Sequence, residues 1–291
     1  MSYIYRAFDI TIHSELKIVA LVPGSGGPHV SIRCGTVPAS VRNPAQQGVC
    51  YQSNEEQLLL RIASVGSYLV EGGREIVVAP APGAECESVT AFLLGVALPA
   101  LLRQRGMLTL RGSVVAGPKG GVLLIGEPGA GKSTAAAVLW RRGFQVVSDG
   151  PCVVAMRDGR AMALGGFRTM HVWSDVLEAI GVRATDLRPV RRPLPVYHLC
   201  TAADQEHTPV ALTSIVAISP HDGALEMKSL DGWGKIRRLS AASLFLGAAA
   251  PAPPQVVLQL ASLLPQRLVL RTFRRRQIHE VAALIEEKLA A

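Results

Sequence analysis

A glycine-rich loop followed by a lysine and a serine is the feature that most limits how this chain folds. The loop consists of Gly126, Glu127, Pro128, Gly129, Ala130, Gly131, Lys132, Ser133 and Thr134, and it fits the Walker A pattern G-x-x-x-x-G-K-[ST]. The apolar run 121–125 predicts a buried strand before the loop, and residues 134–142 predict a helix after it, ended by Gly143. Strand, loop and helix are the context that a phosphate-binding loop needs. A chance glycine turn is the alternative.

The residue types in this loop suit a nucleoside triphosphate with Mg²⁺. Glycines at 126, 129 and 131 let the backbone curl around phosphates, and the first N–H groups of the following helix attract an anion. Lys132 is expected to reach the β- and γ-phosphates, and the Ser133 hydroxyl is expected to hold Mg²⁺. The sequence therefore predicts ATP and Mg²⁺ as ligands.

Two further residues are predicted to lie beside the loop. Residues 144–149 predict a strand that ends in Asp149, and acids at such strand ends beside a phosphate loop bind Mg²⁺ or act as bases. The alternative for Asp149 is a turn before Gly150 and Pro151. Residues 107–116 and 121–125 predict two adjacent strands that lead into the loop, and if they pair as a hairpin, Arg111 lies near the nucleotide.

The rest of the chain divides by pattern into a β-rich region, 1–88, and a second predicted domain, 89–291. In the first region, alternating and glycine-bounded runs predict strands, including a hairpin at 67–79, whereas the polar stretch 46–56 predicts a loop. In the second, periodicity predicts helices at 87–105, 239–250 and 277–289.

Composition excludes several classes. The five cysteines of this 291-residue chain are scattered and form no C-x-x-C pair, which favours a reduced cytoplasmic compartment over a disulfide framework or a zinc site. The longest apolar run, 91–102, is short for a membrane span and predicts a buried helix. The net charge of +8 comes without a nucleic-acid-binding motif, so nucleic acid is not expected as a partner. Most of the short arginine clusters, such as Arg271 with 274–276, are expected to be solvated.

Three stretches together resemble the catalytic core of the HPr kinase/phosphorylase family. They are residues 108–115, the loop 126–134 and residues 142–149. Looser features at 92–106, 164–173 and 268–285 resemble the smaller relatives of that family, which often accompany peptide-modification genes. The resemblance implies an α/β P-loop kinase core of the HPr kinase and phosphoenolpyruvate carboxykinase type, following a β-rich N-terminal region.

The resemblance also implies an activity and roles for four residues. The family phosphorylates a serine hydroxyl of a small protein or peptide with ATP, its loop lysine and serine match Lys132 and Ser133, and its catalytic base matches Asp149. Arg111 stands where the family has histidine, and Gly150 stands where it has a second acid. Arg111 can neutralise phosphate charge but cannot act as a base near neutral pH. The family is often oligomeric, so a homo-oligomer is an expectation.

Three functions remain open on the sequence. The first is a serine or threonine kinase acting on a peptide or small protein, with Asp149, Lys132 and Arg111 as catalytic residues and with Ser133 and Asp149 as metal ligands. The second is an ATP-binding regulatory protein in which the nucleotide orders a surface for a partner. The third is a small-molecule kinase. The first two differ in whether the γ-phosphate leaves ATP.

Overall fold

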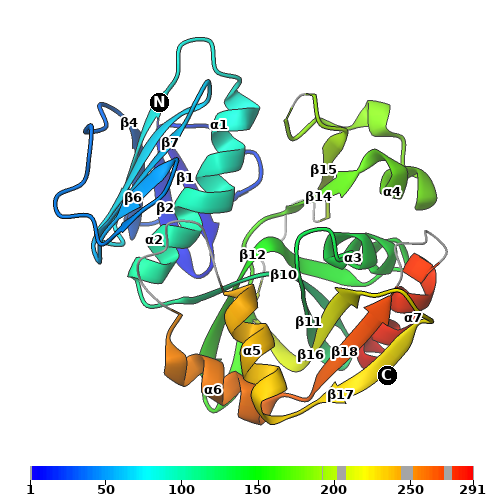
Figure 1. Cartoon of the computed structure of the whole chain (residues 1–291). Coiled ribbons are helices and arrows are strands. Elements are labelled where there is room, and N and C mark those ends of the chain that lie inside the picture. The colour runs from blue at the N-terminus through cyan, green and yellow to red at the C-terminus, as the bar shows by residue number, and fades with distance from the viewer. Residues whose placement is uncertain (1, 192, 202–207, 244–251, 272–276, 291) are drawn as a thin grey trace.

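The computed structural model describes residues 2–191, 193–201, 208–243, 252–271 and 277–290. The chain forms a strand-rich mixed α/β structure with two large sheets, and a helical segment lies between them in sequence (Figure 1). The mixed α/β class and the β-rich N-terminal region predicted from the sequence are therefore confirmed.

The N-terminal sheet has nine strands in the order β3-β1-β2-β4-β9-β8-β7-β6-β5. The hairpin predicted at 67–79 is confirmed as β8 and β9. The prediction of a loop at 46–56 is wrong in part, because β5 and β6 pair there. Strands at a sheet edge pair through backbone groups, so a polar stretch can form them without apolar side chains. The strand bounds are β1 (Tyr3–Ala7), β2 (Ile10–Ser14), β3 (Val22–Pro23), β4 (Val30–Cys34), β5 (Gln46–Gln47), β6 (Tyr51–Ser53), β7 (Gln57–Ile62), β8 (Gly66–Glu71) and β9 (Glu75–Pro80).

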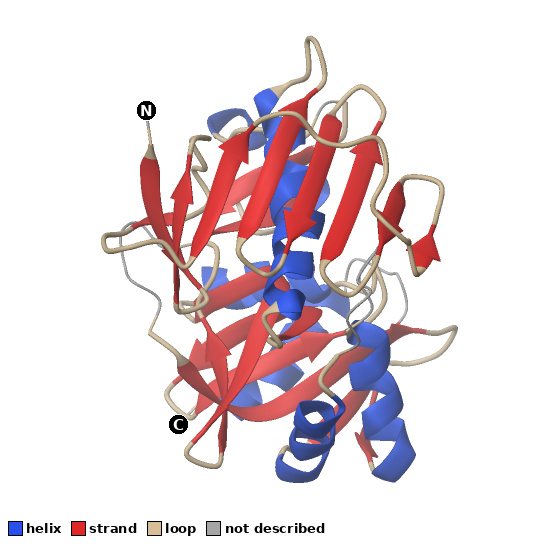
Figure 2. Cartoon of the chain, turned by 90° about the vertical axis from the view of Figure 1, so that its left-hand side faces the viewer, coloured by secondary structure: helices blue, strands red, loops and turns tan. Residues whose placement is uncertain are grey.

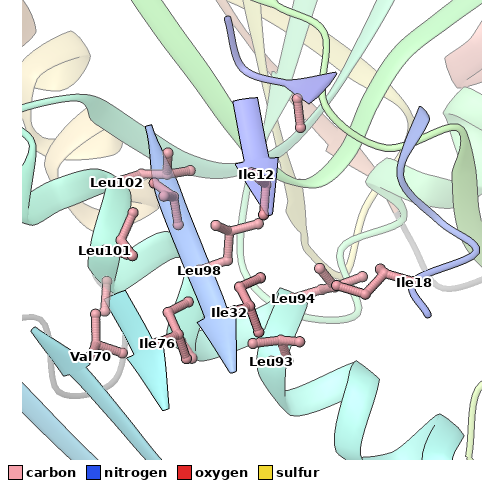
Figure 3. Close-up of a cluster of buried hydrophobic side chains, with 14 of the residues drawn as sticks. Ile12, Ile18, Ile32, Val70, Ile76, Leu93, Leu94, Leu98, Leu101 and Leu102 are labelled. Carbon is pink, nitrogen blue, oxygen red and sulfur yellow. The ribbon is translucent and has the colours of Figure 1, made fainter. Parts of the chain in front are cut away.

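The helical segment 86–104 packs on one face of this sheet, behind the strands as seen in Figure 2. It consists of α1 (Cys86–Phe92), a π-helical turn at Leu93–Ala97 and α2 (Leu98–Gln104), so the helix predicted at 87–105 is confirmed. Leucines and isoleucines from the helix and the strands interlock in this core (Figure 3). The cluster also contains Val153 and Leu164 from the second sheet, so the two regions share a core. The predicted boundary at residue 88 stays a prediction.

The same helical segment is long and apolar enough to cross a membrane by length and composition, and 61% of its apolar window is buried inside the structure. A core helix passes the same test, and the packing of this helix on the sheet agrees with the buried helix predicted at 91–102.

The second sheet has the strand order β11-β10-β12-β13-β16-β18-β17, and β11 also pairs with β16. It is mixed: β11, β16 and β18 run parallel, whereas β10, β12 and β13 are antiparallel to their neighbours. The carboxyl ends of the three parallel strands lie at one edge, where α/β sheets commonly bind ligands. The strand bounds are β10 (Leu108–Gly117), β11 (Gly120–Ile125), β12 (Gln145–Arg157), β13 (Arg160–Leu164), β16 (Val210–Pro220), β17 (Glu226–Leu230) and β18 (Gln266–Arg271).

Helices cover both faces of the second sheet. α3 (Lys132–Arg141) and α7 (Gln277–Leu289) share one apolar cluster with it, and α5 (Gly232–Ala242) and α6 (Pro254–Leu263) share another. The helix predicted at 277–289 is confirmed at both ends. The helix predicted at 239–250 begins earlier than expected, at Gly232, and residues 244–250 lie outside the described part of the chain.

A separate two-stranded sheet stands beside these layers. It pairs β14 (Thr169–Trp173) with β15 (Val196–Cys200), and α4 (Ser174–Ala179) follows β14. In Figure 1 this pair lies to the right of α1, and both stand above β10 and β12.

Candidate functional site

The glycine-rich loop connects β11 to α3, as the sequence predicts. Gly126 and Gly131 have φ values of 148° and 101°, in the region that favours glycine. A Cβ on Gly126 would collide with the carbonyl oxygen of Ile218, the neighbouring residue on β16. The loop therefore has a shape that only glycine permits at these positions, with its tip exposed and Ala130 buried beneath it.

Lys132, the first residue of α3, folds its ammonium group back into the loop. Its Nζ donates hydrogen bonds to the carbonyl oxygens of Gly126 at 2.8 Å and Glu127 at 2.9 Å. Burial lowers the pKa of Lys132, while the nearby charge of Asp149 opposes this shift. The loop thus encloses a partly desolvated cation, which interacts more strongly with a phosphate than an exposed lysine does.

Asp149 lies at the centre of a hydrogen-bonded group of residues. Its Oδ1 accepts hydrogen bonds from Ser113 Oγ at 2.5 Å and from Ser133 Oγ at 2.8 Å. Its Oδ2 accepts one from the backbone N–H of His171 at 3.3 Å. The side chain is 7% exposed, and burial raises the pKa of the carboxyl group, although these hydrogen bonds and Lys132 oppose the shift.

The strand that carries Asp149 does not end there, and this expectation from the sequence is wrong. β12 continues to Arg157 because β10 pairs with it on both sides of the aspartate, from Ser113 opposite Asp149 to Leu108 opposite Val154. Asp149 is therefore a mid-strand residue on an antiparallel strand. It meets the loop because β10 lies between β11 and β12.

The hairpin of β10 and β11 is confirmed, and it brings Arg111 close to the glycine-rich loop. Gly112 of β10 pairs with Ile125, the last residue of β11, so Arg111 lies next to the start of the loop. Its side chain is exposed and lines a pocket that also contains Asp149, and its charge contributes to lowering the pKa of Lys132. The structure therefore brings Arg111, Lys132, Ser133 and Asp149 together.

Arg271 is a further cation at the loop that sequence reasoning missed. It was expected to be a solvated arginine, but it is 6% exposed at the carboxyl end of β18. Its guanidinium group lies against Gly131, where a Cβ would collide with Nη1. Burial lowers the pKa of Arg271. One feature of the sequence pointed to this position, namely that Arg271 lies near the carboxyl end of a strand. The parallel pairing of β16 with β18 brings that end to the loop.

These residues fit a nucleotide with Mg²⁺ better than a metal held by protein alone. Mg²⁺ usually takes one or two protein oxygens together with phosphates and waters, and Ser133 Oγ with the Asp149 carboxylate supplies such a pair. Within the described ranges, no group of three or more His, Cys, Asp or Glu residues is arranged to hold a metal ion. Gly129, at the exposed tip of the loop, has nothing within 4 Å of where a Cβ would stand, which suits the close approach of an anion.

Comparison with known proteins adds a distant structural resemblance. No protein-family model matches the chain, and no curated protein matches it. Among solved structures, the chain is similar to the HPr(Ser) kinase/phosphatase from Coxiella burnetii, with a TM-score of 0.30 and 12% sequence identity. The match covers 62% of this chain and 94% of that one.

Proposed function

We propose that this protein transfers the γ-phosphate of ATP to a serine or threonine hydroxyl of a peptide or small protein. The observation that carries the proposal is the contact between Ser133 of the glycine-rich loop and the buried carboxylate of Asp149. The charge of Asp149 also acts on Lys132 of the loop, which supports the roles of Asp149 as base and of Ser133 as metal ligand in this proposal.

In this proposal the loop residues bind and orient the triphosphate. Backbone N–H groups at the start of α3, the ammonium of Lys132 and the guanidinium of Arg271 face the β- and γ-phosphates and neutralise their charge. Ser133 Oγ and Asp149 Oδ1 would hold Mg²⁺, which would supply further neutralisation of the charge that develops on the phosphates. Arg111, exposed at the start of the loop, would neutralise charge on the transferring phosphoryl group.

The two carboxylate oxygens of Asp149 have different roles in this proposal. Oδ1 faces Ser133 and the loop, whereas Oδ2 faces the backbone of His171. Oδ2 accepts the proton of the acceptor hydroxyl while the hydroxyl oxygen bonds to the γ-phosphorus. The bond from that phosphorus to the β,γ-bridging oxygen breaks, and ADP leaves with the electron pair. The raised pKa of Asp149 makes its carboxylate a stronger base than an exposed aspartate.

The test is transfer of labelled phosphate from γ-labelled ATP with Mg²⁺, measured on candidate peptides by intact mass. We expect Asp149→Asn to bind ATP but to transfer phosphate about 10²–10⁴-fold more slowly, the usual contribution of a positioned base. Asp158→Asn is the matched control, since Asp158 lies on the exposed turn between β12 and β13. Normal transfer by Asp149→Asn contradicts the base assignment. Tight ATP binding with no transfer to any acceptor favours the regulatory ATP-binding alternative.

A further inference from the structure

A large pocket opens beside Asp149, separate from the glycine-rich loop. Its volume is about 540 Å³, and no residue of the loop 126–134 lines it. Arg111, Asp149 and Gly150 form part of its wall, so Asp149 borders both the loop and the pocket. Figure 1 shows α1 on one side of this region and β14 with β15 on the other, above β10 and β12. Asp149 and His171 both line the pocket, so a group that enters it comes close to the side of Asp149 that faces His171.

The walls of the pocket are mainly apolar, and its charges are few. The apolar part comes from the segment 16–20 and from α1 with the turn before it, and it includes Val19, which is 46% exposed. Lys17, Glu87 and Arg188 are the other charged residues that line it. A sugar or another densely polar acceptor would leave most of its hydroxyl groups without partners against such walls. An acceptor with apolar groups next to one hydroxyl matches them.

One wall of the pocket is the edge of a β-strand. The described part of β14 pairs with β15 alone, and Thr169 and His171 of β14 line the pocket. His171 and His198 are opposite each other in this pair but exchange no backbone hydrogen bonds. The N–H of His171 donates to Asp149 Oδ2 instead, and the N–H of His198 donates to the carbonyl oxygen of Arg188. In a strand, alternate residues turn their backbone groups to the same side, so Thr169 and His171 turn theirs away from β15. The N–H of His171 is already bonded to Asp149, so an extended peptide can pair with this edge through the carbonyl of His171 and the backbone of Thr169.

We propose that this pocket binds the acceptor as an extended peptide segment, aligned along β14, with apolar residues on both sides of the hydroxyl-bearing residue. The pocket positions that residue at Asp149. This inference rests on the proposed phosphoryl transfer and goes further by naming the class of acceptor and where it binds.

The experiment compares two pentapeptides and one small alcohol. The peptides are acetyl-Val-Leu-Ser-Leu-Val-amide and acetyl-Asn-Gly-Ser-Gly-Asn-amide, and the small alcohol is N-acetylserinamide. Phosphorylation is followed with γ-labelled ATP, and binding of fluorescein-labelled peptides is measured by anisotropy with a non-hydrolysable ATP analogue. We expect the apolar peptide to be phosphorylated at least about tenfold faster than the other two, since burying one leucine side chain alone accounts for such a factor.

Two glycine variants test whether the peptide binds in this pocket. Gly95 lines the pocket, and a Cβ there meets nothing within 4 Å, so Gly95→Trp fills the pocket without disturbing the core. Gly27→Trp is the matched control, because Gly27 is exposed, outside the pocket and equally unobstructed. We expect Gly95→Trp to weaken binding and phosphorylation of the apolar peptide by about tenfold or more, and Gly27→Trp to leave both unchanged.

The outcomes separate this inference from the proposed function. Equal rates for the three acceptors, or equal rates for the two variants, overturn the pocket assignment while phosphoryl transfer stands. Binding of the apolar peptide that Gly95→Trp abolishes, without any transfer, supports the peptide pocket and contradicts the kinase. If neither peptide binds and neither is phosphorylated, the pocket assignment is wrong.

Discussion

The two sheets differ in where they place charge. The described residues of the N-terminal sheet form a core with a buried helix against one face, and no residue of the glycine-rich loop or its charged partners comes from it. The second sheet is covered by helices on both faces, so its exposed backbone lies at strand ends. There the loop, Lys132 and Arg271 meet at the carboxyl ends of β11 and β18.

Under the proposed function, this difference separates stability from chemistry. The N-terminal sheet and the helix packed on it supply apolar area, and the segment 16–20 with α1 supplies one wall of the pocket. The second sheet carries the groups to which the proposed function assigns phosphate binding and transfer. The comparison predicts that substitutions in the first core change unfolding, and that substitutions at the parallel strand ends change nucleotide handling.

The largest expected effect is on stability and concerns the apolar core of the N-terminal sheet. Leu98 is fully buried between α2 and the N-terminal sheet and does not line the pocket. Leu98→Ala should lower the free energy of unfolding by about 2–5 kcal/mol through lost burial and a residual cavity. Urea unfolding measures the change, and phosphate transfer at low temperature should be nearly normal. Leu258→Ala is the control, since Leu258 is 53% exposed on α6.

If Leu98→Ala abolishes transfer while the fold remains stable, the two sheets are not separated in this way. The N-terminal core would then control the geometry of Asp149 across the shared cluster that contains Val153 and Leu164.

A smaller effect is expected from Arg271, at the strand end of the second sheet. Arg271→Gln removes a buried positive charge beside Gly131 and should weaken ATP binding about 10–100-fold, the range for a charge-assisted hydrogen bond. Calorimetric titration with ATP and Mg²⁺ measures this, with a thermal scan to confirm folding. Arg160→Gln on the exposed β13 terminus is the matched control. Equal affinity for the two variants would remove Arg271 from the phosphate site.

The sequence predicted the loop and the hairpin because both depend on local signals. Glycines, a turn and apolar runs fix β10, β11, the loop and the start of α3 within one short stretch. The neighbouring Asp149 was found for the same reason, but the sequence did not predict that β12 continues past it. That continuation depends on pairing with β10, a strand more than thirty residues earlier in the chain.

The remaining features depend on contacts between distant segments. Arg271 reaches Gly131 only through the parallel pairing of β16 and β18, and the pocket joins residues from Leu16 to His198. No periodicity in the sequence records such contacts. The cytoplasmic location, the homo-oligomer and the absence of a nucleic-acid partner stay predictions.

The smallest expected effect concerns the pocket between the two regions. Burial, with neighbouring His171 and Arg188, lowers the pKa of His198 to about 4, while Glu87 opposes the shift. Burial also lowers the pKa of His171, although its side chain keeps an open face. The two rings pack edge to face with centroids 4.9 Å apart. Both histidines are therefore neutral near pH 7, and protonating either one places a charge in a mainly apolar pocket.

The sign of the pH dependence follows from the unfolded chain, where a histidine has a pKa of about 6.5. Between about pH 6.5 and pH 4 the unfolded chain binds the proton of His198 more tightly, so stability is lost as the pH falls through this window. After allowance for solvent screening, the loss between pH 7 and pH 5 amounts to about 1 kcal/mol. His198→Gln should remove that part of the loss in urea unfolding at the two pH values, with His279→Gln on exposed α7 as the control. An unchanged pH dependence in His198→Gln would show that the ring is solvated, and that the wall of the pocket at β15 is more open to water than its apolar lining indicates.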